Sequence, residues 1–202
     1  MKKTINKEDI IKKALKLFAE NGYHKTSTNE IAKIANVSKG LIFKYFTNKS
    51  KLFSEVIDYS IEKFKSKVSK FEIFSEDPQG IILEAIYFLK NFYDENQDIY
   101  QFYLKSIYFE KIPERKNFKE VVKIFSTEIT LKIILKLKEK NYLKIESDND
   151  ESIMLNFLNS TISRVIESKF FDVKSIFDDK SFCNKFVKLI LYGIIGWSIN
   201  FV

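Results

Sequence analysis

Apolar residues recur at helical spacing along the chain, and short polar segments separate these runs. The spacing predicts a first helix that begins after Asn6 and stops at Asn21 and Gly22. Longer helices are predicted from after Thr47 to about residue 70 and over 80–95, 98–109, 114–142, 150–171 and 180–200. The chain holds only 5 Gly and 2 Pro, too few for the turns of a β protein. The pattern therefore predicts an all-α fold.

Two short helices are predicted between the first helix and the next long one. Ser27 and Glu30 have the spacing of a capping box, which opens the first of them. Asn36 can take the left-handed conformation of a tight turn, and Ser38 is a natural N-cap for the second. Two short helices joined in this way form a helix-turn-helix unit.

The second short helix contains the stretch SKGLIFKYF, residues 38–46. At helical spacing Ile42 and Phe46 fall on the core side, and the outward side carries Lys39, Gly40, Phe43 and Lys44. Glycine inside a helix costs about 1 kcal/mol relative to alanine, and close approach of a DNA backbone or base edge would explain Gly40. A position in the first turn, where this cost is small, combined with simply solvated lysines, explains the stretch equally well.

The net charge of +7 is concentrated at the N-terminal end. Residues 1–52 hold 12 of the 34 basic residues and 4 of the 27 acidic ones, a charge of +8, and the rest of the chain carries −1. This distribution is typical of a polyanion-binding N-terminal part, here called the head (about residues 1–52), followed by a near-neutral remainder, here called the body.

The string TSTNEIAKIANVSKGLIFKYFTNKSKL, residues 26–52, resembles the DNA-binding domain of the TetR family of bacterial transcription regulators, as does LFAENGYHKTS before it. The resemblance covers about the first quarter of the chain. It implies a three-helix helix-turn-helix DNA-binding domain over 1–48 and a larger helical effector-binding and dimerisation domain over 49–202. The second domain matches the family only in length and helicity.

The resemblance also implies a homodimer that places one recognition helix per subunit in successive major grooves of a double-stranded operator. Lys39 matches the base-reading start of that helix and is the candidate for a guanine O6/N7 contact. Thr28, Tyr45 and Lys49 match phosphate-contacting positions. The expected DNA-binding residues are Thr28, Ser38, Lys39, Gly40, Phe43, Lys44, Tyr45 and Lys49.

Three positions depart from the family pattern. Phe43 stands where the family often has a tyrosine, so the ring can pack against sugar but cannot donate a hydrogen bond to phosphate. Asn36 replaces a common glycine in the turn. Ser50 replaces the usual glutamate of a capping box at the next helix, which weakens the start of that helix by about 0.5 kcal/mol.

The chain lacks a recognisable set of catalytic or metal-binding residues. His24 is the only histidine and Cys183 the only cysteine, which leaves neither a zinc set nor an internal disulfide. No phosphate-binding loop or nucleophile elbow occurs. We therefore expect no enzyme activity, no cofactor and no metal.

The segment 85–109 carries more bulky rings than one amphipathic helix face can hide. Some of them are expected to line a cavity for a flat or hydrophobic effector. Packing in the core and at interfaces accounts for them equally well. The candidate effector-binding residues are Tyr87, Phe88, Phe92, Tyr103 and Tyr108.

The last two predicted helices resemble the pair that forms a four-helix dimer interface in this family. Gly193 and Gly196 are three residues apart, so they lie on one face and permit close helix approach. Trp197 is a candidate interface anchor. The predicted interface residues are Phe157, Ile162, Leu189, Gly193, Gly196 and Trp197.

The sequence thus predicts a cytoplasmic homodimeric regulator, a repressor that leaves its operator when a small hydrophobic or aromatic effector binds. No apolar signal segment follows Met1, and the apolar tail 189–199 is shorter than the roughly 20 residues that span a bilayer, so no membrane association is expected. The alternatives are a helical small-molecule-binding protein or enzyme with a basic N-terminal segment, and a membrane-surface protein. A ligand-independent or activating regulator is the nearest alternative of the same class.

Overall fold

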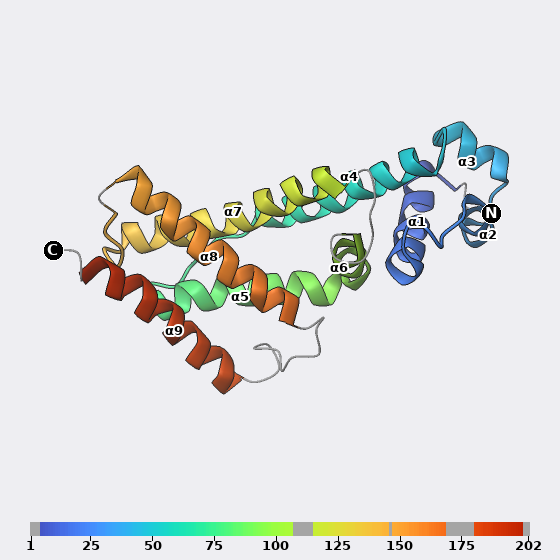
Figure 1. The fold of residues 1–202 in the computed structure, drawn as a ribbon. Helices are drawn as coiled ribbons and strands as arrows, with labels where there is room; N and C mark the ends of the chain where they lie inside the picture. The colour runs from blue at the N-terminus through green and yellow to red at the C-terminus, as the bar shows by residue number, and fades with distance from the viewer. Residues whose placement is uncertain (1–4, 107–114, 146, 169–179, 200–202) are drawn as a thin grey trace. The chain divides into compact units, whose positions relative to one another are not determined.

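The computed structural model describes residues 5–106, 115–145, 147–168 and 180–199, and for 115–126, 163–168 and 195–199 it describes the backbone alone. All the regular elements in these ranges are helices (Figure 1), which confirms the all-α prediction. They are α1 (Lys7–Asn21), α2 (Thr28–Ala35), α3 (Lys39–Tyr45), α4 (Lys49–Val68), α5 (Pro78–Glu95), α6 (Gln97–Leu104), α7 (Arg115–Glu139), α8 (Asp148–Ser168) and α9 (Lys180–Ile199).

Several helices begin at a side chain that caps their first free N–H groups. Asn6 Oδ1 accepts the Asp9 N–H at 2.9 Å, and the Asp9 carboxylate accepts the Asn6 N–H at 3.2 Å, so α1 starts with a capping box. Asp77 caps α5 by accepting the Gly80 N–H at 2.9 Å. Ser147 caps α8 by accepting the Asp150 N–H at 3.2 Å. These polar residues fix the helix starts from within the local sequence.

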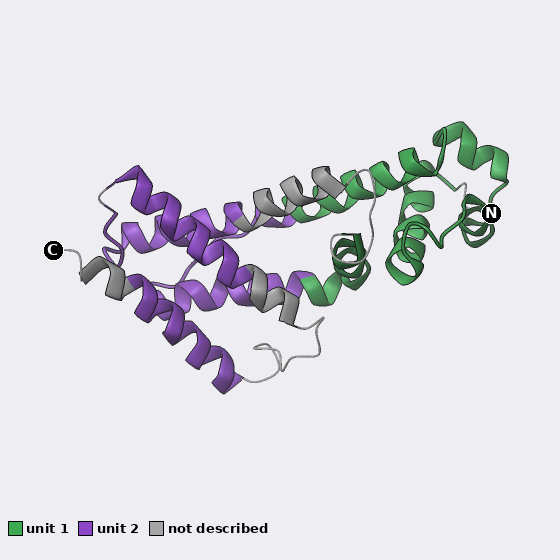
Figure 2. Cartoon of the chain, in the orientation of Figure 1, with its two compact units in different colours: residues 1–66, 93–122 green, residues 67–92, 123–202 purple. Residues whose placement is uncertain are grey.

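The chain divides into two compact units (Figure 2). Unit 1 comprises Met1–Ser66 and Tyr93–Val122, and unit 2 comprises Lys67–Phe92 and Lys123–Val202. The division falls inside α4, α5 and α7, so each unit is built from segments that are distant in the sequence.

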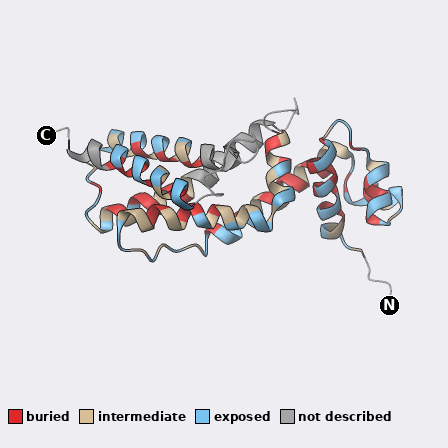
Figure 3. Ribbon diagram, turned by 90° about the horizontal axis from the view of Figure 1, so that it is seen from below, coloured by how far each residue is buried: buried red, intermediate tan, exposed pale blue. Residues whose placement is uncertain are grey.

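The core of unit 1 contains an aromatic cluster contributed by three helices. The ring of Phe53 in α4 lies 5.0 Å from that of Phe18 in α1 and 5.1 Å from that of Phe102 in α6, both in edge-on arrangements. The three rings are at most 1% exposed. Figure 3 shows in red where buried residues lie along the helices. The sequence placed Phe102 among the aromatic residues of the body, whereas the structure places it in the same core as the helix-turn-helix.

The lysine that follows α6 also binds the end of α1. Lys105 Nζ donates hydrogen bonds to the carbonyl oxygens of Ala19 at 3.1 Å and Glu20 at 2.7 Å. The last carbonyls of a helix have no partner inside the helix and carry the negative end of its dipole. An ammonium group is therefore a favourable partner for them, and α6 contributes polar as well as apolar contacts to α1.

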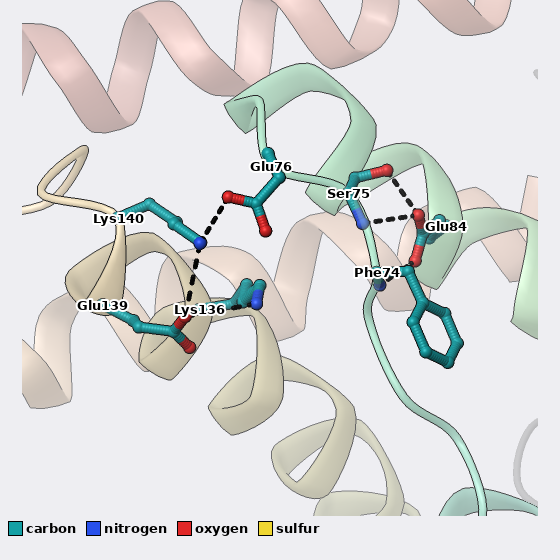
Figure 4. A network of polar contacts seen from close by, with 7 residues as sticks. All are labelled: Phe74, Ser75, Glu76, Glu84, Lys136, Glu139 and Lys140. Atoms are coloured by element: carbon teal, nitrogen blue, oxygen red, sulfur yellow. Dashed lines mark hydrogen bonds and ion pairs between the residues drawn. The ribbon is translucent and has the colours of Figure 1, made fainter.

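Polar contacts in unit 2 join its helices to the segment before α5. The Glu84 carboxylate accepts the N–H groups of Phe74 and Ser75, both at 2.8 Å, and the Ser75 hydroxyl (Figure 4). Lys140, at the end of α7, forms an ion pair with Glu76 of the same segment. These contacts bind the chain between α4 and α5 to α5 itself and to the region that follows α7.

Within the described ranges, none of the helices combines the length and apolar character needed to cross a bilayer.

Candidate nucleic-acid interface

The first helix of the helix-turn-helix starts at the predicted capping box. The Ser27 hydroxyl accepts the Glu30 N–H at 3.2 Å, and the Glu30 carboxylate accepts the Ser27 N–H at 2.7 Å. This backbone N–H, together with the hydroxyl of Ser27, holds the pKa of the Glu30 carboxyl below its usual range. The predicted start of α2 is therefore present, with both partners of the box engaged.

The turn between α2 and α3 depends on Asn36. Its backbone is left-handed, with φ 53° and ψ 47°, a conformation that asparagine tolerates better than most side chains. The Asn36 N–H bonds to the Lys33 carbonyl at 3.2 Å, and the Val37 N–H bonds to the Ala32 carbonyl at 3.0 Å. This pair of bonds is the Schellman motif, which ends a helix and redirects the chain.

One face of α3 (Lys39–Tyr45) packs against the core. Ser38 caps it by accepting the Leu41 N–H at 3.2 Å. Ile42 is 1% exposed and Phe46, which follows the helix, is fully buried. The separation into an inner and an outer face, predicted from spacing, is observed at these two positions.

The opposite face of α3 is open to solvent and mixes lysines with aromatic rings. All its members are exposed, including the large rings of Phe43 at 42% and Tyr45 at 39%. Lys39 Nζ lies 5.8 Å from the centre of the Phe43 ring, within range of a cation–π interaction. We call this surface the α3 face; it consists of Lys39, Gly40, Phe43, Lys44 and Tyr45.

Gly40 has no packing role within the described part of the chain. A Cβ added there would meet only the Ser38 Oγ, at 3.8 Å, which is an ordinary van der Waals contact. The helix around Gly40 could therefore accept alanine, which has the higher helix propensity. Gly40 is the second residue of α3, in the first turn, where glycine costs little, and its open side leaves room for close approach of a partner.

Two more of the predicted DNA-binding residues are the first residues of the helices before and after α3. Thr28 is the first residue of α2 and is half-buried. Lys49 is the first residue of α4, and its Nζ donates to the carbonyls of Tyr23 at 2.9 Å and Thr26 at 3.2 Å. Two of the three N–H groups of the Lys49 ammonium are thus used inside the protein. The phosphate contact expected of Lys49 stays a prediction.

The sequence reasoning missed the residues that hold the loop before α2. Thr26 is 1% exposed, and its hydroxyl hydrogen-bonds the carbonyls of Gly22 at 2.7 Å and Leu17 at 3.2 Å. The sequence does contain a signal for this role. Thr26 and Ser27 are adjacent hydroxyl residues, and because only Ser27 serves as the N-cap, the hydroxyl of Thr26 is available for another contact.

The sequence model of the tetR family of bacterial regulatory proteins matches residues 10–56, a range that includes α2, the turn and the whole α3 face. Residues 10–56 of this chain therefore belong to the tetR family.

Relatives in the tetR family match only part of the chain. The HTH-type transcriptional regulator YuxN of Bacillus subtilis is 32% identical over 96 residues, which are 48% of this chain and 33% of that protein. The HTH-type transcriptional regulator AcrR of Shigella flexneri is 35% identical over 85 residues, 40% of this chain and 38% of that protein. The matches thus span about a third of the length of these relatives.

The fold as a whole is also found in tetR-type structures. A transcriptional regulator of Aquifex aeolicus superimposes with a TM-score of 0.65 at 20% identity, over 93% of this chain and 98% of that one. At this identity the likeness shows a shared fold for the helical body as well as for the head.

The candidate effector-binding residues belong to different units. Tyr87, Phe88 and Phe92 lie on α5 in unit 2, where Phe88 stacks on Phe71 with ring centres 4.3 Å apart. Tyr103 lies on α6 and packs against the core of unit 1. Tyr108 lies outside the described residues. An effector site built on this set stays a prediction.

The candidate dimer residues include both exposed and buried side chains. Phe157 of α8 is 42% exposed and Leu189 of α9 is 69% exposed, whereas Ile162 is buried within this chain. A Cβ on Gly193 would lie 3.2 Å from Phe157 Cζ, so this glycine permits close approach of α9 to α8. For Gly196 and Trp197 the structure describes the helical backbone alone.

Groups of His, Cys, Asp and Glu that could hold a metal ion do not occur among the described residues. Cys183 is buried, and burial raises the pKa of its thiol, consistent with a small apolar residue in the core.

Proposed function

We propose that this chain is a sequence-specific DNA-binding transcriptional regulator that reads the major groove with the α3 face. The observation that carries the proposal is this face itself, a capped helix that buries Ile42 and exposes lysines, aromatic rings and a glycine. A single helix fits the major groove, where lysine can contact guanine O6 and N7 and apolar groups can contact the thymine methyl. Two exposed lysines supply the cations that phosphate attracts.

We further propose a homodimer that pairs through α8 and α9. The support is a set of exposed large apolar side chains on these two helices, which soluble chains usually bury against a partner. They are Ile153, Phe157, Phe182, Leu189 and Tyr192. Two subunits would present two α3 faces to half-sites about one helical turn apart.

We also propose that this regulator is a repressor and that a small effector releases it from its operator. An effector releases a repressor from DNA when it binds the DNA-incompetent state more tightly, and the DNA then weakens effector binding by the same factor. The aromatic residues of α5, Tyr87, Phe88 and Phe92, are the proposed contacts for a small hydrophobic or aromatic effector in the cytoplasm.

The proposal is tested by selecting duplexes from a random double-stranded DNA library with the purified protein. We expect enrichment of a palindromic site that the protein binds at least about 1,000-fold more tightly than random DNA. Failure to enrich any sequence would contradict the DNA-binding proposal. Selected DNA that no aromatic or long-chain hydrophobic compound releases would contradict the effector part alone.

A further inference from the structure

Lys49 has an unusual position for a lysine. It is the first residue of α4, where the helix dipole is positive and a cation is unfavourable. The residue is half-buried, unlike the exposed lysines of the α3 face. A cation at this place needs compensation from other groups.

The compensation comes from the loop that joins α1 to α2. Lys49 Nζ donates to the Tyr23 carbonyl at 2.9 Å and to the Thr26 carbonyl at 3.2 Å. The same ammonium lies 4.3 Å from the centre of the Tyr23 ring, a close cation–π contact. Charge-assisted hydrogen bonds of this kind are stronger than bonds between neutral groups.

Lys49 and Thr26 together bind three carbonyls of this loop. The single O–H group of Thr26 donates to the Gly22 carbonyl at 2.7 Å, with the Leu17 carbonyl of α1 at 3.2 Å, so the two side chains bind the carbonyls of Gly22, Tyr23 and Thr26. Removing the lysine would leave partly buried carbonyls without these donors, which destabilises that arrangement. The loop ends at Ser27, the N-cap of α2, and Thr28 follows directly.

We propose that Lys49 supports DNA binding as a positioning residue, which holds the loop 22–27 and the start of α2, rather than as a phosphate contact. The inference rests on the proposed DNA-binding function. Its physical basis is that the ammonium is already bound to two carbonyls and a ring, and that these contacts fix the chain immediately before Thr28.

The two roles predict different salt dependence. Each phosphate contact releases counterions, so loss of one contact lowers the slope of log affinity against log salt by about 0.9. Loss of a positioning residue lowers affinity at every salt concentration and leaves the slope unchanged. The positioning role also predicts an effect in the free protein, where no phosphate is present.

The test compares Lys49→Met with Lys44→Met, which removes an exposed lysine of the α3 face. Binding to the selected duplex is measured from low to high salt for both variants. Amide hydrogen exchange of Gly22 and Ser27 is measured without DNA, because their N–H groups donate to the Phe18 carbonyl and the Glu30 carboxylate. Tyr23→Leu is the second variant; it removes the ring beneath the ammonium and leaves the formal charge unchanged.

We expect Lys49→Met to weaken binding about tenfold with an unchanged salt slope and to speed exchange of the two amides about tenfold. Tyr23→Leu should also weaken DNA binding and speed exchange of the two amides. Because this variant keeps the charge, lost electrostatic attraction to DNA cannot explain such a result. Lys44→Met should lower the slope and leave exchange unchanged.

The inference is overturned if Lys49→Met lowers the slope by about 0.9, as one phosphate contact requires, with unchanged amide exchange. It is equally overturned if affinity and exchange both stay at the values of the unmodified protein. A library that yields no selected duplex contradicts the proposed function instead. Exchange in the free protein then still decides whether Lys49 holds the loop.

Discussion

The α3 face and the exposed face of α8 and α9 both present large apolar side chains to solvent, but their charge differs. Helix α3 places two lysines among its seven residues, beside Phe43 and Tyr45. The stretch Leu189–Ile199 of α9 contains no charged residue, and its exposed members Leu189 and Tyr192 lie near the Gly193–Phe157 contact. Exposed rings among lysines fit a polyanion, whereas an uncharged apolar stretch fits another protein surface.

The largest effect is expected from a charge on α9. Leu189→Glu would bury a carboxylate in the proposed dimer interface, so we expect the dimer dissociation constant to rise by about 100-fold or more. Sedimentation analysis measures the change. Leu135→Glu is the matched control, because Leu135 is 60% exposed on α7 of the same unit and lies outside the proposed interface. Equal behaviour of the two variants would break the comparison.

The next effect concerns base recognition by the α3 face. Lys39→Ala should cost about 1–3 kcal/mol on the selected duplex and much less on a duplex changed at the contacted guanine. Lys44→Ala should weaken binding to both duplexes by the same factor. Competition binding with single-base variants of the duplex measures both. A uniform loss for Lys39→Ala would assign that lysine to phosphate instead.

Gly40→Ala should change stability and DNA affinity in opposite directions. The added Cβ meets only Ser38 Oγ at 3.8 Å, so the free protein should gain up to about 0.5 kcal/mol from helix propensity in the first turn. The same methyl group would stand between α3 and the DNA, so affinity should fall. Thermal unfolding and duplex binding are measured on one preparation. A variant that is more stable and binds DNA equally well would show that the α3 face does not approach DNA closely at Gly40.

The smallest effect is expected from the ion pairs of Glu55 on α4. Lys7, 2.9 Å from the Glu55 carboxylate, holds the pKa of Glu55 below its usual range, and Lys51 at 3.5 Å adds to this. A lowered pKa in the folded state means that the contribution to stability is present above the ordinary pKa and is lost as the pH falls through the folded value.

Glu55→Gln should therefore lower the free energy of unfolding by about 0.5 kcal/mol at neutral pH. The difference from the unmodified protein should shrink from about pH 4.5 downward. Denaturant unfolding at several pH values measures it. Glu20→Gln is the control, since Glu20 lies 3.9 Å from Lys16 and should show a smaller difference at neutral pH. A difference for Glu55→Gln that does not change with pH would contradict the assigned ion pairs.

The helix starts of the head could be predicted because their determinants are local. Ser27 and Glu30 are three residues apart, and the hydrogen bonds that they form depend on little else. Asn36 ends α2 because few other side chains tolerate its left-handed backbone. Once Ile42 is assigned to the core, the 3.6-residue period places Phe43 and Lys44 outward. The period also placed Tyr45 on the core side, whereas its ring is 39% exposed.

The contacts that complete the head could not be predicted in the same way. Phe102 joins the rings of Phe18 and Phe53, and Lys105 reaches the end of α1, although α6 lies far along the chain. No local pattern distinguishes such residues from other aromatic residues or surface lysines. The proposed role of Lys49 was missed for a different reason. Its match to the family pattern pointed to a phosphate contact, and nothing in the sequence indicated hydrogen bonds to the loop carbonyls.

The burial of Phe102 also has a consequence for synthesis of the protein. Because the ring belongs to the same core as Phe18 and Phe53, a nascent chain that has emerged only as far as α4 lacks part of that core. Its head would still expose apolar surface that α6 later covers, and such surface is prone to aggregation or chaperone capture. The core that supports the helix-turn-helix can therefore be completed only after α6 has also been synthesised.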